Sequence, residues 1–170
     1  MAQTDWQLAQ LNVGRIVAPT DSPPLADFMA RLDDINALAE RSPGFVWRLK
    51  GDSGNATEIL TTPDPLFLIN MSVWESVEAL FAFVYRSAHT HVMARRREWF
   101  ERPVEAYQVL WWVPAGHLPT AQEALDRLAH LRTAGPSPHA FTFKQHYPPP
   151  SAASSDPADM RPEPYCVGWA

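Results

Sequence analysis

The chain has 170 residues, of which 46% are hydrophobic and 19% are charged, and its formal net charge is −5. A chain of this length and composition forms one soluble domain that buries a core without metals or disulfides. The acidic balance, with a pI near 5.6, argues against a nucleic-acid-binding surface. The single cysteine, Cys166, excludes an internal disulfide framework and a cysteine metal cluster.

Targeting segments are not evident. No apolar run approaches the ~20 residues that a membrane span needs. The first 13 residues lack the basic flank and the long apolar centre of a signal peptide. We therefore expect a cytoplasmic protein with neither a nucleic-acid nor a membrane partner.

The first 50 residues predict a strand, a helix and a second strand. Residues 6–13 alternate between a face with Leu8, Gln10 and Asn12 and a face with Ala9, Leu11 and Val13. Ser22 followed by Pro23 predicts a helix start, with a cap and a first-turn proline. The helix then carries an apolar stripe at helical spacing: Leu25, Phe28, Met29, Leu32, Ile35 and Ala39. Asn36 interrupts this stripe, either as a core amide with a partner or as a pocket residue. Residues 45–49 predict a short strand, and residues 50–65 an exposed connection.

Residues 66–74 predict the strand around which the chain is organised. One face is dry, with Phe67, Ile69, Met71 and Val73, and the other is mixed, with Leu68, Asn70, Ser72 and Trp74. Such a strand is expected to be packed on both faces, and the packing over the mixed face is expected to leave room for a polar group. This pattern indicates a small-molecule pocket without identifying a reaction.

The next helix begins at the cap Ser76 and carries Val77, Leu80, Phe81 and Val84 on one stripe. If it is unbroken, the same face reaches Ala88, His91, Arg95 and Trp99. Ser87 could instead cap a new helix. Residues 107–113 predict a further strand, a capping box of Thr120 and Glu123 starts the last helix, and residues 141–143 add a short edge strand.

This element order predicts the split β-α-β, ferredoxin-like fold, an α+β antiparallel sheet with helices on one face. The opposite, dry face must also be buried. A second copy of the same sheet is the simplest cover, which predicts a homodimer closed into an α/β barrel. The domain is expected to span residues 1–147, and the Pro-rich tail at residues 148–170 is expected to be flexible.

Several blocks resemble a bacterial family described as domain of unknown function 3291. They are LAQLNVGR, INALAERSPGFVWRL, LINMSVWESVEALFAFVYRSAH, RRREWF, VLWWVPAGHLPT and GPSPHAFTF. The resemblance covers about residues 6–147 and implies no particular activity. More distantly, the arrangement is similar to the dimeric α/β-barrel superfamily, which includes antibiotic-biosynthesis monooxygenases and haem-degrading monooxygenases.

The cofactor-independent monooxygenases of that superfamily carry an asparagine and, four residues later, a tryptophan on the strand before the second helix. Asn70 and Trp74 match this spacing, and Asn12 could supply the asparagine that those enzymes carry on the first strand. The haem-degrading relatives place an axial histidine on the second helix, where His89 and His91 lie up to about a turn too early. Only His91 falls on the predicted buried stripe.

The candidate constellation combines amides, an imidazole, a guanidinium and indoles. Asn70, Trp74, His91 and Arg95 are the predicted catalytic residues, and Gln10, Asn12, Asn36, Trp111 and Trp112 the predicted substrate-binding residues. Amides and arginine can stabilise an enolate oxygen, histidine can move a proton near neutral pH, and indoles contact flat substrates. Plain core packing remains the alternative reading of each aromatic residue.

Three functions follow from this constellation. The first is a cofactor-independent enzyme, monooxygenase-like or isomerase- and cyclase-like, acting on an aromatic or enolisable substrate. The second is a haem-binding or haem-processing protein, with haem as the alternative cofactor. The third is a non-catalytic dimer that binds a small ligand. No metal-ligand spacing, phosphate loop or nucleophile motif is present in the sequence.

Overall fold

The computed structural model describes residues 5–150, so residues 1–4 and most of the predicted tail, residues 151–170, lie outside the described part. The elements in chain order are β1 (Trp6–Arg15), the 3-10 helix η1 (Pro23–Leu25), α1 (Ala26–Arg41), β2 (Phe45–Arg48), β3 (Phe67–Trp74), α2 (Val77–Arg86), α3 (His89–Ala94), α4 (Arg96–Trp99), β4 (Gln108–Pro114) and α5 (Ala121–Ala134). Residues 50–66 form the expected long connection without helix or strand.

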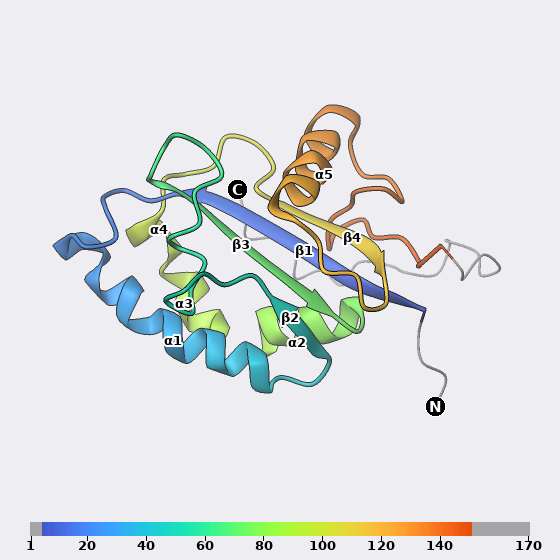
Figure 1. Cartoon of the computed structure of the whole chain (residues 1–170), viewed down its shortest axis with the longest axis horizontal. Helices are drawn as coiled ribbons and strands as arrows, with labels where there is room; N and C mark the ends of the chain where they lie inside the picture. The colour runs from blue at the N-terminus through green and yellow to red at the C-terminus, as the bar shows by residue number, and fades with distance from the viewer. Residues whose placement is uncertain (1–4, 151–170) are drawn as a thin grey trace.

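The four strands form one antiparallel sheet in the order β2-β3-β1-β4 (Figure 1). This order and these directions confirm the predicted α+β, ferredoxin-like fold. In the register of the two central strands, Asn12 lies opposite Asn70 and Gln10 lies opposite Ser72. The predicted edge strand at residues 141–143 reduces to a single bridge between Phe141 and Leu110.

The mixed face of the sheet packs on α1 and α2. Leu8, Trp74 and Leu110 of the sheet form a cluster with Ala39 of α1 and with Val77, Leu80 and Val84 of α2. This cluster covers only one end of the face. A smaller cluster of Ile16, Leu25, Leu68 and Trp99 closes the other end. Apolar packing at both ends leaves the middle of the mixed face available for a cavity.

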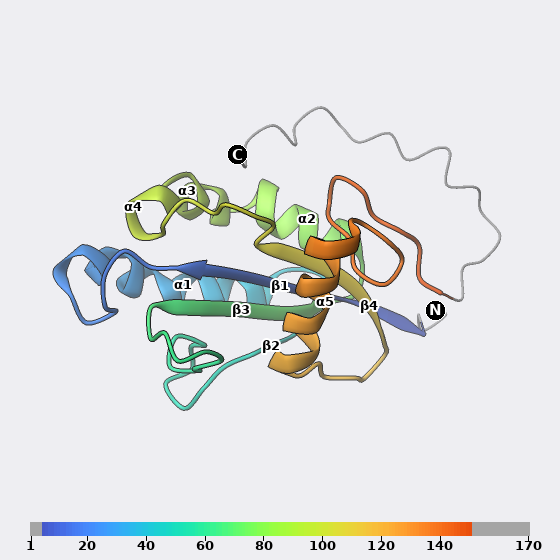
Figure 2. The same ribbon diagram turned by 90° about the horizontal axis from the view of Figure 1, so that it is seen from above.

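The dry face is covered by the chain's own last helix, which corrects the expectation that helices lie on one face only. Ala124, Leu128 and Leu131 of α5 pack against dry-face residues of three strands, including Leu11 of β1, Met71 of β3 and Val109 of β4. Figure 2 looks onto the sheet from this side, with α5 in front of the strands and α1 behind them. Leu11, Met71 and Val109 are fully buried within the single chain. These dry-face residues are therefore buried without a second copy of the sheet, and the homodimer stays a prediction.

The helices begin largely where the sequence predicts. The Ser76 hydroxyl accepts a hydrogen bond from the Ala79 backbone N–H, and Thr120 accepts one from Glu123. Ser22 precedes the short η1 helix and bonds back to the Pro19 carbonyl instead of capping α1. Among residues 5–150, no helix is both long enough and apolar enough to cross a membrane.

The segment after α2 is broken into short helices. Ser87 is extended, and its hydroxyl accepts a hydrogen bond from the His89 backbone N–H at 3.1 Å. A second irregularity at Arg95 separates α3 from α4. Of the two predicted alternatives, the break at Ser87 is the one observed, and it changes which side chains of this segment face the sheet.

Candidate functional site

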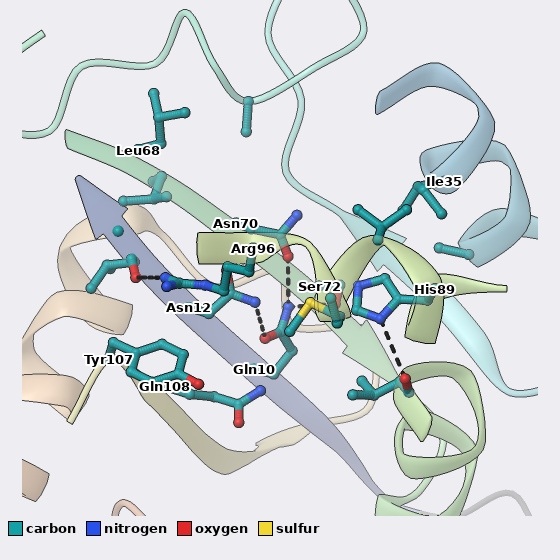
Figure 3. A pocket seen from close by; sticks show the side chains of 18 of the residues that line it. Gln10, Asn12, Ile35, Leu68, Asn70, Ser72, His89, Arg96, Tyr107 and Gln108 are labelled. Carbon is teal, nitrogen blue, oxygen red and sulfur yellow. Dashed lines mark hydrogen bonds between the residues drawn. The ribbon is translucent and has the colours of Figure 1, made fainter. Parts of the chain in front are cut away.

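A cavity of about 730 Å³ lies between the mixed face of the sheet and the helices α1 to α4 (Figure 3). Its floor is formed by alternate residues of the central strands, and its walls come from α1, from the segment of residues 83–107 and from the loop at residues 55–57. A volume of this size accommodates a small molecule of several fused rings.

A row of amide and hydroxyl groups crosses the cavity floor. The side-chain amide of Gln10 donates to Asn70 Oδ1 and to Ser72 Oγ, both at 2.9 Å, and Asn12 Nδ2 lies 3.5 Å from Gln10 Oε1 (Figure 3). Gln10 is almost fully buried, whereas Asn70 is exposed although it lies on a central strand. The Asn70 side chain is exposed because it faces the cavity. Among the described residues, its amide N–H groups have no hydrogen-bond partner, so they can donate to a ligand.

Trp74 closes one end of this row. Its indole N–H donates to Ser72 Oγ at 2.8 Å, and its ring stacks on Phe83 with centroids 5.1 Å apart. The ring also meets Phe45 edge to face. Trp74 therefore lines the cavity as a fixed wall whose polar group is already satisfied.

His89 points into the cavity near the Trp74 end (Figure 3). Its Nδ1 lies 3.4 Å from the Val84 carbonyl oxygen, and its ring packs on Phe83 at a centroid distance of 4.8 Å. A carbonyl oxygen only accepts, so Nδ1 carries the proton of the neutral ring and Nε2 keeps a lone pair. Burial lowers the pKa of His89. The imidazole is therefore neutral at pH 7, as a proton acceptor must be.

Arg96 lies at the opposite end of the row, beside Tyr107 (Figure 3). Its guanidinium carbon is 4.6 Å from the ring centroid of Phe100 and 4.7 Å from that of Tyr107. Burial lowers the pKa of Arg96, although arginine stays charged at any physiological pH. One end of the cavity thus carries a fixed positive charge, and the other a neutral base.

The structure brings five of the predicted residues to the cavity: Gln10, Asn12, Asn36, Asn70 and Trp74. Asn36 satisfies both predicted readings, because it lines the cavity and also donates to Asn55 Oδ1 at 2.6 Å.

The other four predicted residues do not line the cavity, which corrects their expected placement there. His91 is exposed, and Arg95 pairs with Asp27 and Glu98 outside the cavity. Trp111 lies on the opposite, dry face, because residues of β4 alternate, and its indole N–H donates to Glu123. Trp112 is on the correct face, but it packs at the margin and donates to the Tyr147 carbonyl.

His89 and Arg96 are the cavity residues that the predicted constellation missed. An unbroken helix would have turned His91 and Arg95 toward the sheet. The break at Ser87 changes the phase of the segment, so His89 and Arg96 face the cavity instead. The signal in the sequence was the capping potential of Ser87, which predicted a break but not the new direction of the side chains.

The structure describes no cluster of three or more His, Cys, Asp or Glu side chains that could hold a metal ion within residues 5–150. His89 lines the cavity with its Nε2 available, so this imidazole could serve as an axial ligand to a haem iron.

Comparison with solved structures finds distant likenesses. One is a protein of unknown function, NE2512 from Nitrosomonas europaea, with 18% identity and a TM-score of 0.42, covering 69% of this chain and 98% of that one. Another is SnoaB, a cofactor-independent oxygenase from Streptomyces nogalater, with 15% identity and a TM-score of 0.41, covering 66% of this chain and 95% of that one. At these levels of identity and TM-score, neither likeness identifies an activity. No functionally curated protein matches the chain.

A family assignment comes from the sequence model of one protein family. The model described as "domain of unknown function (DUF3291)" matches residues 7–157, which is most of the chain. This confirms the resemblance predicted from the sequence blocks. The chain therefore belongs to the DUF3291 family.

Proposed function

We propose that this protein is a cofactor-independent enzyme that removes a proton from a planar, enolisable aromatic substrate, as a monooxygenase or an isomerase does. The observation that carries the proposal is the neutral imidazole of His89 facing a roomy cavity whose floor is a row of amides. The spacing of Asn70 and Trp74, which resembles that of cofactor-independent monooxygenases, is consistent with it.

In the proposed reaction, each group has a distinct task. Nε2 of His89 accepts a proton from an acidic carbon of the substrate. The amide N–H groups of Asn70 donate to the carbonyl oxygen, which becomes negative as the enolate forms. The hydrogen bond that Asn70 accepts from Gln10 holds its side chain in place before the substrate arrives. The surrounding aromatic rings exclude water and hold the substrate flat.

Oxygenation would use molecular oxygen as the co-reactant. The carbanion of an anthrone, for example, forms a carbon–oxygen bond with O₂, and His89 returns its proton to the peroxide anion. Loss of water from the hydroperoxide then gives the quinone. One anthrone and one O₂ thus become one anthraquinone and one water.

Oxygen uptake with anthrone tests this proposal. Replacement of His89 by Ala should lower the rate roughly a hundredfold to ten-thousandfold, the usual contribution of a positioned base. His91→Ala is the matched control, because His91 is exposed on the same short helix and should leave the rate unchanged. Equal rates for the two variants would contradict the role of His89. Binding of anthrone without any turnover would favour a non-catalytic ligand-binding protein.

A haem protein is the second candidate, favoured by one observation. The Nδ1 of His89 lies within hydrogen-bonding distance of a backbone carbonyl, and its Nε2 is available for an axial bond. Native mass spectrometry of protein purified from its own host would detect retained haem, and it would also test the predicted homodimer by mass. A Soret band on adding haemin that is lost in His89→Ala but kept in His91→Ala would support this candidate. No band in the wild-type protein would exclude it.

A further inference from the structure

Arg96 is built into the cavity wall by close packing against β1. Its Nη2 lies 3.4 Å from the Val13 carbonyl oxygen, to which it donates. The next residue, Gly14, has no side chain, and a Cβ there would lie 2.8 Å from Arg96 Nη2 and 2.6 Å from Phe100 Cδ1. The guanidinium and the phenyl ring therefore occupy the space that a side chain at position 14 would take. A positive charge is held at a defined place against the cavity floor.

The acidic side chains nearest to Arg96 in the sequence are engaged by other arginines. Glu98 pairs with Arg95 at 2.7 Å, Glu101 pairs with Arg15, and Glu105 lies 3.4 Å from Arg132. Of the three arginines that line the cavity, Arg31 pairs with Asp27 and Arg48 pairs with Glu40. Within residues 5–150, Arg96 forms no ion pair with any carboxylate.

Tyr107 does not neutralise Arg96 either. Burial raises the pKa of Tyr107 to about 12, with Arg96 acting in the opposite direction, so the phenol stays protonated at neutral pH. The contacts that Arg96 makes with Phe100 and Tyr107 use the faces of the aromatic rings. An uncompensated charge in a partly desolvated wall attracts an anion strongly.

We propose that the physiological ligand carries an anionic group, a carboxylate or an ionised phenol, which binds Arg96 at the end of the cavity opposite His89. Gln108 lines the same end, opposite Asn12 in the register, and supplies a second polar group. The amide row runs between the two ends (Figure 3). The anionic group therefore orients the substrate so that its acidic carbon meets His89 and its carbonyl meets Asn70.

A pair of ligands of equal shape and different charge tests this anion site. We would titrate the full chain with 1-naphthoate and with neutral 1-naphthamide at pH 7.5 by isothermal titration calorimetry. The wild-type protein should bind naphthoate roughly tenfold to a hundredfold more tightly, as expected for a charge-assisted hydrogen bond. Arg96→Met should abolish this preference and leave the affinity for naphthamide nearly unchanged.

The neighbouring arginine provides the matched control. Arg95→Met removes an equal charge one residue away, but Arg95 already pairs with Asp27 and Glu98, so the preference for naphthoate should persist. If Arg96→Met does not fold, Arg96→Lys replaces it and should keep part of the preference, because it keeps the charge but loses the planar fork. Equal affinities in the wild-type protein, a preference that survives Arg96→Met, or no binding of either compound at millimolar concentration would overturn the anion site.

This inference rests on the proposed function, because both use the same cavity, yet the two can fail separately. Anthrone carries no carboxylate, so its turnover does not require the anion site. Oxygen uptake that depends on His89, without a preference for naphthoate in the binding assay, would support the proposed function and contradict the anion site. A preference for naphthoate that depends on Arg96, without turnover of any substrate, would support the anion site and contradict the proposed enzymatic function.

Discussion

The two faces of the sheet are made by the same strands and are filled in opposite ways. On the dry face, Leu11, Met71 and Val109 interdigitate with α5, and each is fully buried. On the mixed face, the neighbouring residues Gln10, Asn70 and Gln108 border a cavity of about 730 Å³. A sheet whose residues alternate can therefore separate stability from function, because consecutive side chains serve different faces.

Substitutions at two adjacent residues of β3, one on each face of the sheet, should differ most in their effect on stability. Met71→Ala should lower the free energy of unfolding by about 2–5 kcal/mol, because it leaves a hole in a filled core. Asn70→Ala should lower it by about 1 kcal/mol or less, since Gln10 keeps Ser72 as an acceptor. Urea denaturation of the two variants measures the difference. Similar losses at both positions would show that the mixed face is as tightly packed as the dry one.

A smaller effect comes from the pH dependence of stability. Burial lowers the pKa of His89 in the folded state below its ordinary value near 6.5. Between those two values the unfolded chain binds more protons, so the stability present above about pH 6.5 falls as the pH drops through this window. His89→Gln should reduce the loss of stability between pH 7.5 and 5.5, as measured by urea denaturation at each pH.

The control for that measurement is again the exposed neighbour. His91→Gln makes the same replacement at an exposed position of the same short helix, outside the cavity, and is the reference for His89→Gln. An unchanged pH dependence in His89→Gln would mean that His89 is solvated in the folded protein. Such a result would also weaken its assignment as the neutral base of the cavity.

The local elements of the fold could be predicted because their signals are short-range. The alternation in residues 66–74 predicts β3, and the caps Ser76 and Thr120 mark the starts of α2 and α5. The order of elements then leads to the ferredoxin-like sheet, which is observed. The placement of α5 could not be predicted in this way, because its apolar stripe fits the chain's own sheet and the sheet of a second copy equally well.

Some residues of the candidate site could also be predicted from the sequence, and others could not. Gln10, Asn12 and Asn70 were predictable because a strand has a fixed period of two, so the face of each residue follows from its number. His89 and Arg96 were not, because one extended residue at Ser87 rotates every side chain that follows relative to the preceding helix. Trp111 shows the same limit on β4, because the register with β1, which pairs Trp111 with the dry-face residue Ala9, decides which alternate residues of β4 face the cavity.

The family, the strands, their amphipathic faces and the row of amides can all be read from local patterns in the sequence. That α5 fills the dry face, that a cavity remains on the other face, and that His89 and Arg96 lie at the two ends of this cavity became evident only in the folded chain. Hydrogen bonds and side-chain periods act over a few residues, whereas packing between distant segments determines which surfaces meet and where space is left.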